Sequence, residues 1–89
     1  MDKEQIRERI LRWQLLAEQY FNENQNVFIK TLNDDIYFCK IVLVGETKVL
    51  VDIYAPEQRA GKREPIDWLN ISKFDKVNEE EQRWVRKIK

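Results

Sequence analysis

The sequence of 89 residues contains no histidine, which removes the commonest general base and the commonest metal ligand together. It has one cysteine, Cys39, so no intramolecular disulfide can form. No apolar run approaches the roughly 18–20 residues that a membrane-spanning helix needs. The sequence also lacks a phosphate-binding glycine loop, a metal-ligand spacing, and a nucleophile beside an evident base. We therefore expect no enzyme, no bound cofactor or metal, and no membrane association.

The charge is balanced, because 16 Lys and Arg residues match 16 Asp and Glu residues. A general nucleic-acid binder carries a positive excess, so a nucleic-acid contact here requires a local basic patch. Hydrophobic residues make up 43% of the chain and charged residues 36%, a composition that excludes disorder for most of its length. The stretch MDKEQIRER at the N-terminus is unlike a signal peptide. We expect an intracellular protein, either cytoplasmic or nuclear.

The strongest strand signal lies between Ile36 and Tyr54, which reads IYFCKIVLVG, then ETK, then VLVDIY. Two β-branched and aromatic runs around a short polar connection predict a bent central hairpin. In the first run apolar residues fall on both faces, so we expect that strand to be covered on both sides. In the second run Val49, Val51 and Ile53 share one face, which we expect to be buried.

The whole pattern predicts a single domain over residues 1–89 that is mainly β. We expect a small five-stranded antiparallel barrel, SH3-like or Sm-like, with an N-terminal α-helix and a short C-terminal helix. An Asp2 N-cap starts the first helix, and the turn residues 33–35 precede the central hairpin. The fourth strand is predicted at PIDWL and the fifth at FDKV. The expected segments are the N-terminal helix at 2–21, the barrel at 27–77 and the C-terminal helix at 79–88.

The first helix is amphipathic, and two interpretations of it stay open. The apolar positions at helical spacing are Ile6, Ile10, Trp13, Leu16, Ala17, Tyr20 and Phe21. This stripe is explained if the helix covers one open side of the barrel. The alternative is a helix that binds a protein partner through Trp13, Leu11 and Leu15. The two leucines support this alternative, because they make the apolar arc wider than one contact requires.

A helix followed by five strands, with long second and third strands and a polar loop before the fourth, resembles the Sm-like fold. The resemblance covers roughly residues 2–77 and rests on VFIKTLNDDIYFCKIVLVG and EPIDWLNISKFDKV. The RNA-contacting motifs of the family are not matched, since Gly45-Glu46-Thr47-Lys48 and Asn70-Ile71-Ser72 stand in their places. Tudor and SH3 domains share the strand plan. The resemblance implies an RNA-binding barrel that self-assembles when neighbouring subunits pair their edge strands.

The loop APEQRAGKRE at residues 55–64 contains the one basic cluster of the predicted barrel. Cations there could contact RNA phosphates, and a nearby aromatic ring could stack on a base. The predicted RNA-binding residues are Arg59, Lys62, Arg63, Lys48 and Tyr54. Trp68 is a second candidate ring, although a tryptophan in an alternating strand is more often part of the core. The simpler interpretation is a solvated loop, because acidic residues alternate with the basic ones.

The sequence thus predicts a non-catalytic binding module and leaves its partner open between two classes. The resemblance favours an Sm-like RNA-binding protein that forms homo-oligomers. The neutral charge favours a protein-interaction or assembly adaptor, in which exposed apolar residues of the first helix contact a protein partner. Salt separates the two, because binding to phosphates weakens steeply as salt rises and apolar docking does not.

Overall fold

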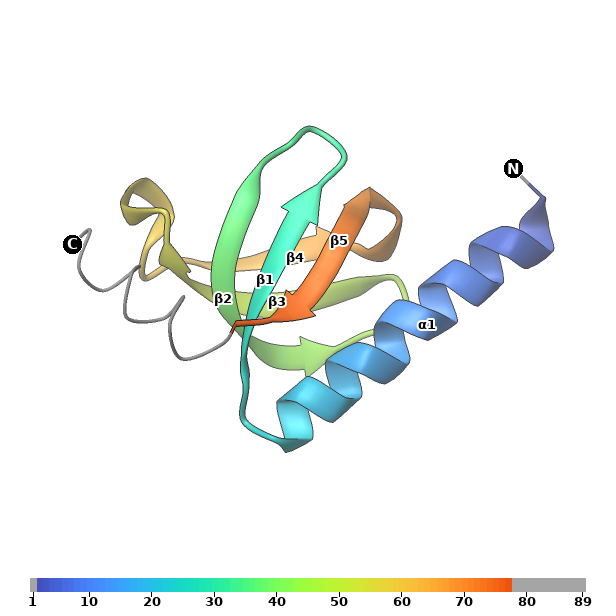
Figure 1. Cartoon of the computed structure of the whole chain (residues 1–89), viewed down its shortest axis with the longest axis horizontal. Coiled ribbons are helices and arrows are strands. Elements are labelled where there is room, and N and C mark those ends of the chain that lie inside the picture. The colour runs from blue at the N-terminus through green and yellow to red at the C-terminus, as the bar shows by residue number, and fades with distance from the viewer. Residues whose placement is uncertain (1, 78–89) are drawn as a thin grey trace.

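The computed structural model describes residues 2–77. The helix α1 (Lys3–Asn22) precedes five strands, and two short 3-10 helices lie on either side of the fourth strand (Figure 1). The strands form one antiparallel sheet in the order β4-β3-β2-β1-β5. The elements after α1 are β1 (Asn26–Thr31), β2 (Ile36–Val44), β3 (Lys48–Ala55), η1 (Glu57–Arg59), β4 (Arg63–Asp67), η2 (Trp68–Asn70) and β5 (Ile71–Lys76).

This arrangement confirms a mainly β fold with five antiparallel strands and an N-terminal helix. The predicted C-terminal helix at 79–88 lies outside the described residues. None of the helices within residues 2–77 combines the length and the apolar composition of a membrane span.

The bounds of α1 follow from its capping residues. Asp2 accepts a hydrogen bond from the backbone N–H of Glu4 at 3.5 Å, which confirms the predicted N-cap. After the helix ends, Asn24 adopts a left-handed conformation with φ 56°, which asparagine tolerates better than most residues. Ala17 and Tyr20 are buried against the sheet. Phe21 does not share their face: it is 49% exposed, because the next position around the helix turns away from the sheet.

The inner faces of β2 and β3 form the centre of the core. Val49, Val51 and Ile53 are buried, as the alternation predicts. The prediction that β2 is covered on both faces is wrong. A β-bulge between Ile41 and Leu43 shifts the register against β3 and reverses the alternation. Leu43 is therefore 61% exposed, and Val44 packs against the core instead.

The fourth strand begins and ends earlier than PIDWL predicts. β4 starts at Arg63 and stops at Asp67, whose side chain accepts a hydrogen bond from Leu69 N–H at 3.0 Å and caps η2. This turn directs Trp68 into the core, where it is 0% exposed, and its Nε1 donates to the Gly45 carbonyl at 3.0 Å. Trp68 is therefore a core residue and no stacking platform. The fifth strand is longer than FDKV and spans Ile71–Lys76.

We predict that Trp68→Phe destabilises the fold, because it leaves a void in a closely packed core and removes the bond to Gly45. The free energy of unfolding should fall by about 1–3 kcal/mol in urea denaturation. Leu69→Ala is the matched control in the same turn: Leu69 is 42% exposed, and its change should stay within about 0.5 kcal/mol. Equal losses in the two variants would contradict the assignment of Trp68 as a core anchor.

Candidate functional site

The two arginines of the predicted RNA-binding cluster are bound to carboxylates of the same chain. In η1, Arg59 Nη1 donates to Glu64 at 3.1 Å, and its guanidinium lies 5.2 Å from the centre of the Tyr37 ring. Arg63 belongs to β4, not to the loop, and pairs with Asp52 across the strand register. Its Nε and Nη2 donate to the two Asp52 oxygens at 2.7 and 3.2 Å. These bonds to Arg63 hold the pKa of Asp52 below its usual value.

The other three predicted RNA-binding residues lie apart from one another. Lys62 is exposed, and its side chain makes no ion pair within residues 2–77. Lys48 begins β3 and stands opposite Asp67 in β4. Tyr54 is half-buried in a row of rings across three strands, 6.4 Å from Phe38, which itself contacts Phe28 at 5.4 Å. The predicted cluster is therefore not one continuous surface.

Lys48 and Arg59 do meet in one polar pocket of about 360 Å³, where the turn between β1 and β2 approaches β4. Three carboxylates, those of Asp35, Glu64 and Asp67, line the same pocket. Because the carboxylates outnumber the cations, the pocket disfavours a phosphate. Burial raises the pKa of the Tyr37 hydroxyl in this pocket, and the Arg59 charge opposes that rise.

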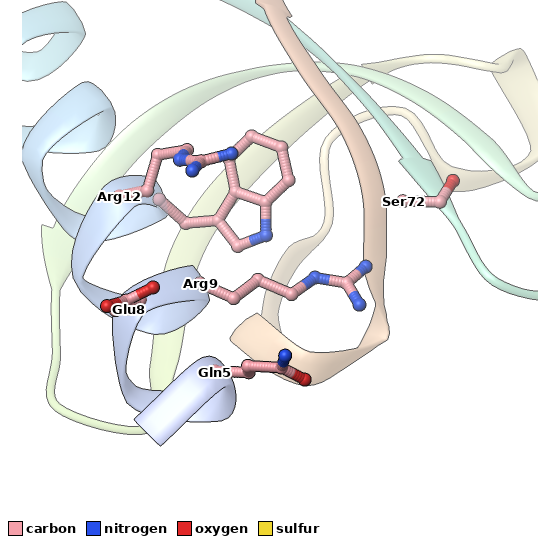
Figure 2. A pocket seen from close by; sticks show the side chains of 6 residues that line it. Gln5, Glu8, Arg9, Arg12 and Ser72 are labelled. Carbon is pink, nitrogen blue, oxygen red and sulfur yellow. The ribbon is translucent and has the colours of Figure 1, made fainter. Parts of the chain in front are cut away.

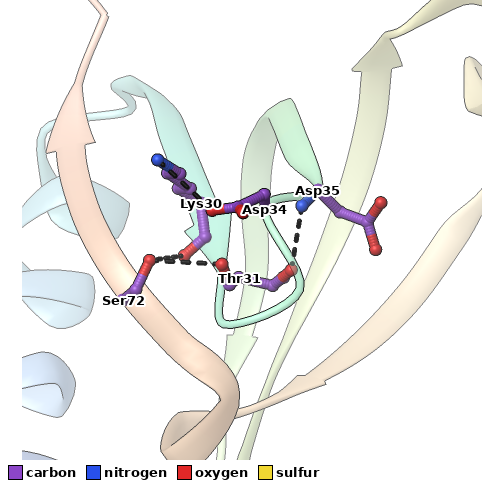
Figure 3. Close-up of polar contacts among 5 residues, drawn as sticks. All are labelled: Lys30, Thr31, Asp34, Asp35 and Ser72. Carbon is purple, nitrogen blue, oxygen red and sulfur yellow. Dashed lines mark hydrogen bonds and ion pairs between the residues drawn. The ribbon is translucent and has the colours of Figure 1, made fainter.

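The adjacent carboxylates Asp34 and Asp35 are explained by the turn between β1 and β2 (Figure 3). Asp34 has φ 65° and pairs with Lys30 Nζ at 3.5 Å. The Asp35 backbone N–H donates to Thr31 Oγ1 at 3.2 Å. From β5, Ser72 Oγ lies 3.1 and 3.2 Å from the carbonyls of Lys30 and Thr31, and so joins β5 to this turn. The two adjacent aspartates are therefore explained by their place in the turn, where aspartate is a favoured residue.

The structure separates the three predicted partner-binding residues of α1. The Trp13 ring stacks on Phe74 of β5, with centroids 5.9 Å apart and planes 23° apart, and is partly buried. Leu11 and Leu15 face away from the sheet and are 54% and 58% exposed. Trp13 thus helps α1 to pack over the sheet, and the two leucines form a separate exposed pair.

Trp13 also lines a groove between α1 and β5 of about 440 Å³ (Figure 2). Its other lining residues are Gln5, Glu8, Arg9, Arg12 and Ser72. Sequence reasoning missed this groove because Ser72 lies some sixty positions from the two arginines. The available signal was local: Arg9 and Arg12 precede Trp13 by four and one positions, which places all three on one side of a helix.

The strands at the two borders of the sheet, β4 and β5, are poorly suited to pairing with another chain. Arg9 Nη2 donates to the Ile71 carbonyl at 2.8 Å at the start of β5, while Trp13 and Tyr20 both pack on Phe74. The Arg9 side chain therefore occupies one backbone acceptor at the start of β5, and the two rings cover the face of the sheet at Phe74. β4 has five residues with Pro65 at its centre, and proline has no N–H to donate to an added strand.

The single thiol is not placed for chemistry. Cys39 is 0% exposed, and burial raises its pKa to about 12. Within residues 2–77 no group of three or more Cys, Asp or Glu side chains is placed to hold a metal ion.

We predict that Cys39 is inert in the folded protein. A thiol whose pKa is about 12 stays protonated at pH 8, and its burial blocks the reagent. A disulfide reagent such as dithionitrobenzoate should release no colour from native protein at pH 8 over an hour, and one equivalent in denaturant. Rapid labelling of the native protein at pH 8 would show that Cys39 is accessible and ionised.

Comparison with known proteins adds no relative to this picture: no protein family matches the sequence, and no curated protein shows significant similarity to it. The function is therefore argued from the surfaces described above.

Proposed function

We propose that this chain is a non-catalytic protein-interaction module that self-associates through the outward face of α1. The observation that supports the proposal is the exposure of Leu11 and Leu15, 54% and 58%, one helical turn apart on the side that faces away from the sheet. Adjacent exposed leucines on a helix stabilise an association when a second apolar surface removes them from water.

A second copy of the chain is the partner whose charges fit this face. At helical spacing Arg7, Leu11, Leu15 and Glu18 follow one another along α1. In an antiparallel helix pair with a two-fold axis between the leucines, Leu11 contacts Leu15 of the second copy. Arg7 then approaches Glu18 of the second copy, and the same pair forms twice. Two leucines per copy make an interface well below the roughly 1,600 Å² of a stable complex, so the dimer is weak and concentration-dependent.

This proposal replaces assembly through strand edges, because Pro65 interrupts the β4 border and Arg9 occupies one backbone acceptor at the start of β5. The strand order β4-β3-β2-β1-β5 and the short turn η2 before β5 support a small Sm-like or SH3-like barrel as the scaffold, and we keep that part of the proposal.

RNA binding is the less favoured function. Its predicted surface loses two cations to Glu64 and Asp52, and the chain as a whole carries no net charge. Lys62 is left as the single unpaired cation of the three in that cluster.

We predict that a mixed-sequence single-stranded RNA does not bind specifically. Its fluorescence anisotropy should not rise with protein at moderate salt, and the weak signal at low salt should disappear as salt is added. Replacing Arg59, Lys62 and Arg63 together by alanine should leave the titration at moderate salt unchanged. Tight binding in the wild type that this triple variant abolishes would reinstate the RNA-binding function.

We predict a concentration-dependent dimer in light scattering, with the mean mass rising toward twice 10.9 kDa near about 1 mM protein, where a weak complex is half formed. The double variant Leu11→Gln with Leu15→Gln should stay monomeric over the same range. Leu32→Gln is the matched control, since Leu32 is also 58% exposed but lies outside α1. This control should dimerise like the wild type.

A charge exchange tests the antiparallel arrangement. Glu18→Lys should weaken the dimer, because it places two cations together, and adding Arg7→Glu should restore it.

A protein that is monomeric at every concentration, or a Leu32→Gln variant as monomeric as the leucine double variant, would refute self-association through α1.

A further inference from the structure

We infer that the groove between α1 and β5 binds a carboxylate of an acidic segment in a protein partner. The groove is separate from the leucine pair: its arginines, Arg9 and Arg12, lie on the side of α1 that turns toward β5, as Figure 2 shows. The inference rests on the proposed function only in taking the ligand from a protein, and it does not require self-association.

Arg9 is positioned before any ligand arrives. Its Nη2 donates to the Ile71 carbonyl at 2.8 Å, which fixes the guanidinium against the start of β5. A guanidinium has five N–H donors, so this bond leaves others available to a ligand in a planar fork that matches a carboxylate. The long side chain of Arg9 has therefore already lost much of its freedom, and binding a ligand costs less entropy than it would at a free surface.

Arg12 and Trp13 are polar groups of the groove that the fold leaves without partners. Arg12 makes no hydrogen bond or ion pair with any residue in the described range 2–77. Trp13 Nε1 is inaccessible to solvent and finds no acceptor among the same residues. Because this N–H is closed to solvent, it is not itself open to a ligand, and the Trp13 indole serves as a reporter of the groove beside the two arginines. By contrast, the indole N–H of Trp68 is fully satisfied by the Gly45 carbonyl.

The charge of the groove selects the class of anion. Glu8 lines it together with the two arginines, so the side chains around the cavity carry one net positive charge. One carboxylate neutralises that charge. A phosphate dianion brings more negative charge than the groove offers and approaches Glu8 as well. An RNA phosphodiester carries a single charge, as a carboxylate does, but its neighbouring phosphates also need cations, and a chain without net charge does not supply them. A glutamate or aspartate side chain from a partner therefore fits better than a nucleic acid.

The test is a titration followed by two-dimensional ¹H–¹⁵N NMR, in which each tryptophan indole gives its own signal. The probe is an acetylated, amidated tetraglutamate peptide, and the tetraglutamine peptide of the same length is its control. We expect the tetraglutamate peptide to shift the Trp13 indole signal saturably, since that ring lies in the groove beside Arg9 and Arg12. The Trp68 indole signal should not move, and the tetraglutamine peptide should have no effect.

Matched arginine variants locate the binding. Arg12→Gln should weaken the tetraglutamate affinity about tenfold or more, as loss of a charged hydrogen-bonding partner does. Because Arg12 has no partner in the described residues, the backbone NMR spectrum of the Arg12→Gln variant should otherwise match that of the wild type. Lys3→Gln removes the same charge from another position on α1, outside the groove, and should leave the affinity unchanged. Equal weakening by both variants would mean general attraction to a cationic helix and would overturn the site.

Two further arms separate the ligand classes and the two proposals. Inorganic phosphate or an oligouridylate that shifts Trp13 more tightly than tetraglutamate would overturn the carboxylate assignment. The titration is repeated in the Leu11→Gln, Leu15→Gln background, where tetraglutamate binding should persist. If the wild-type protein dimerises but does not bind tetraglutamate, this inference alone is refuted. If it binds tetraglutamate but does not dimerise, self-association alone is refuted.

Discussion

The carbonyl of Gly45 joins three parts of this fold that are distant in sequence. It accepts one hydrogen bond from Trp68 Nε1 and another from Gln14 Nε2, each at 3.0 Å. The first bond joins the turn between β2 and β3 to η2, and the second joins it to α1. The backbone N–H of Gly45 donates to Lys48 at 2.9 Å and closes the turn. A side chain is excluded here, because a Cβ on Gly45 would lie 2.8 Å from the Lys48 carbonyl oxygen.

This junction decides which face of α1 is available for contacts. Gln14 is held against the turn, where its Nε2 also bonds the Glu46 carbonyl at 3.0 Å, so the rotation of the helix about its axis is fixed. With that rotation Trp13 and Tyr20 point to Phe74, while Leu11 and Leu15 point away from the sheet. The same rotation brings Arg9 to Ile71 and so creates the groove. The exposed leucine pair and the groove are thus two results of one packing choice.

The local parts of the fold could be predicted from the sequence, because their signals are local. The alternation in Val49, Val51 and Ile53 identified the buried face of β3, and Asp2 identified the start of α1. The bulge beside Leu43 could not be predicted, since it depends on how β2 and β3 adjust to each other's twist. The sequence also placed Arg63 in a loop, although the fourth strand begins two residues earlier than predicted and so brings Arg63 opposite Asp52.

The candidate site was harder to predict than the fold, because ion pairs formed on folding decide which cations remain available. A cluster of cations in a sequence gives no information about which of them carboxylates will neutralise after folding. Arg59 and Arg63 look like phosphate ligands in a row of ten residues, yet Glu64 and Asp52 occupy both. The cations available to a ligand are those that the fold leaves unpaired, and within residues 2–77 Arg12 is one of them, beside Arg9 in the groove between α1 and β5.

The two proposed surfaces are compatible in one assembly, because they lie on different sides of α1. An antiparallel pair that buries Leu11 and Leu15 leaves Arg9 and Arg12 beside β5 in each copy, so a dimer presents two grooves. A partner with two acidic segments could then bind both grooves at once, and the second contact would form at the high effective concentration of a tethered ligand. If both proposals hold, such a partner strengthens the dimer and the dimer strengthens its binding, because each association favours the other.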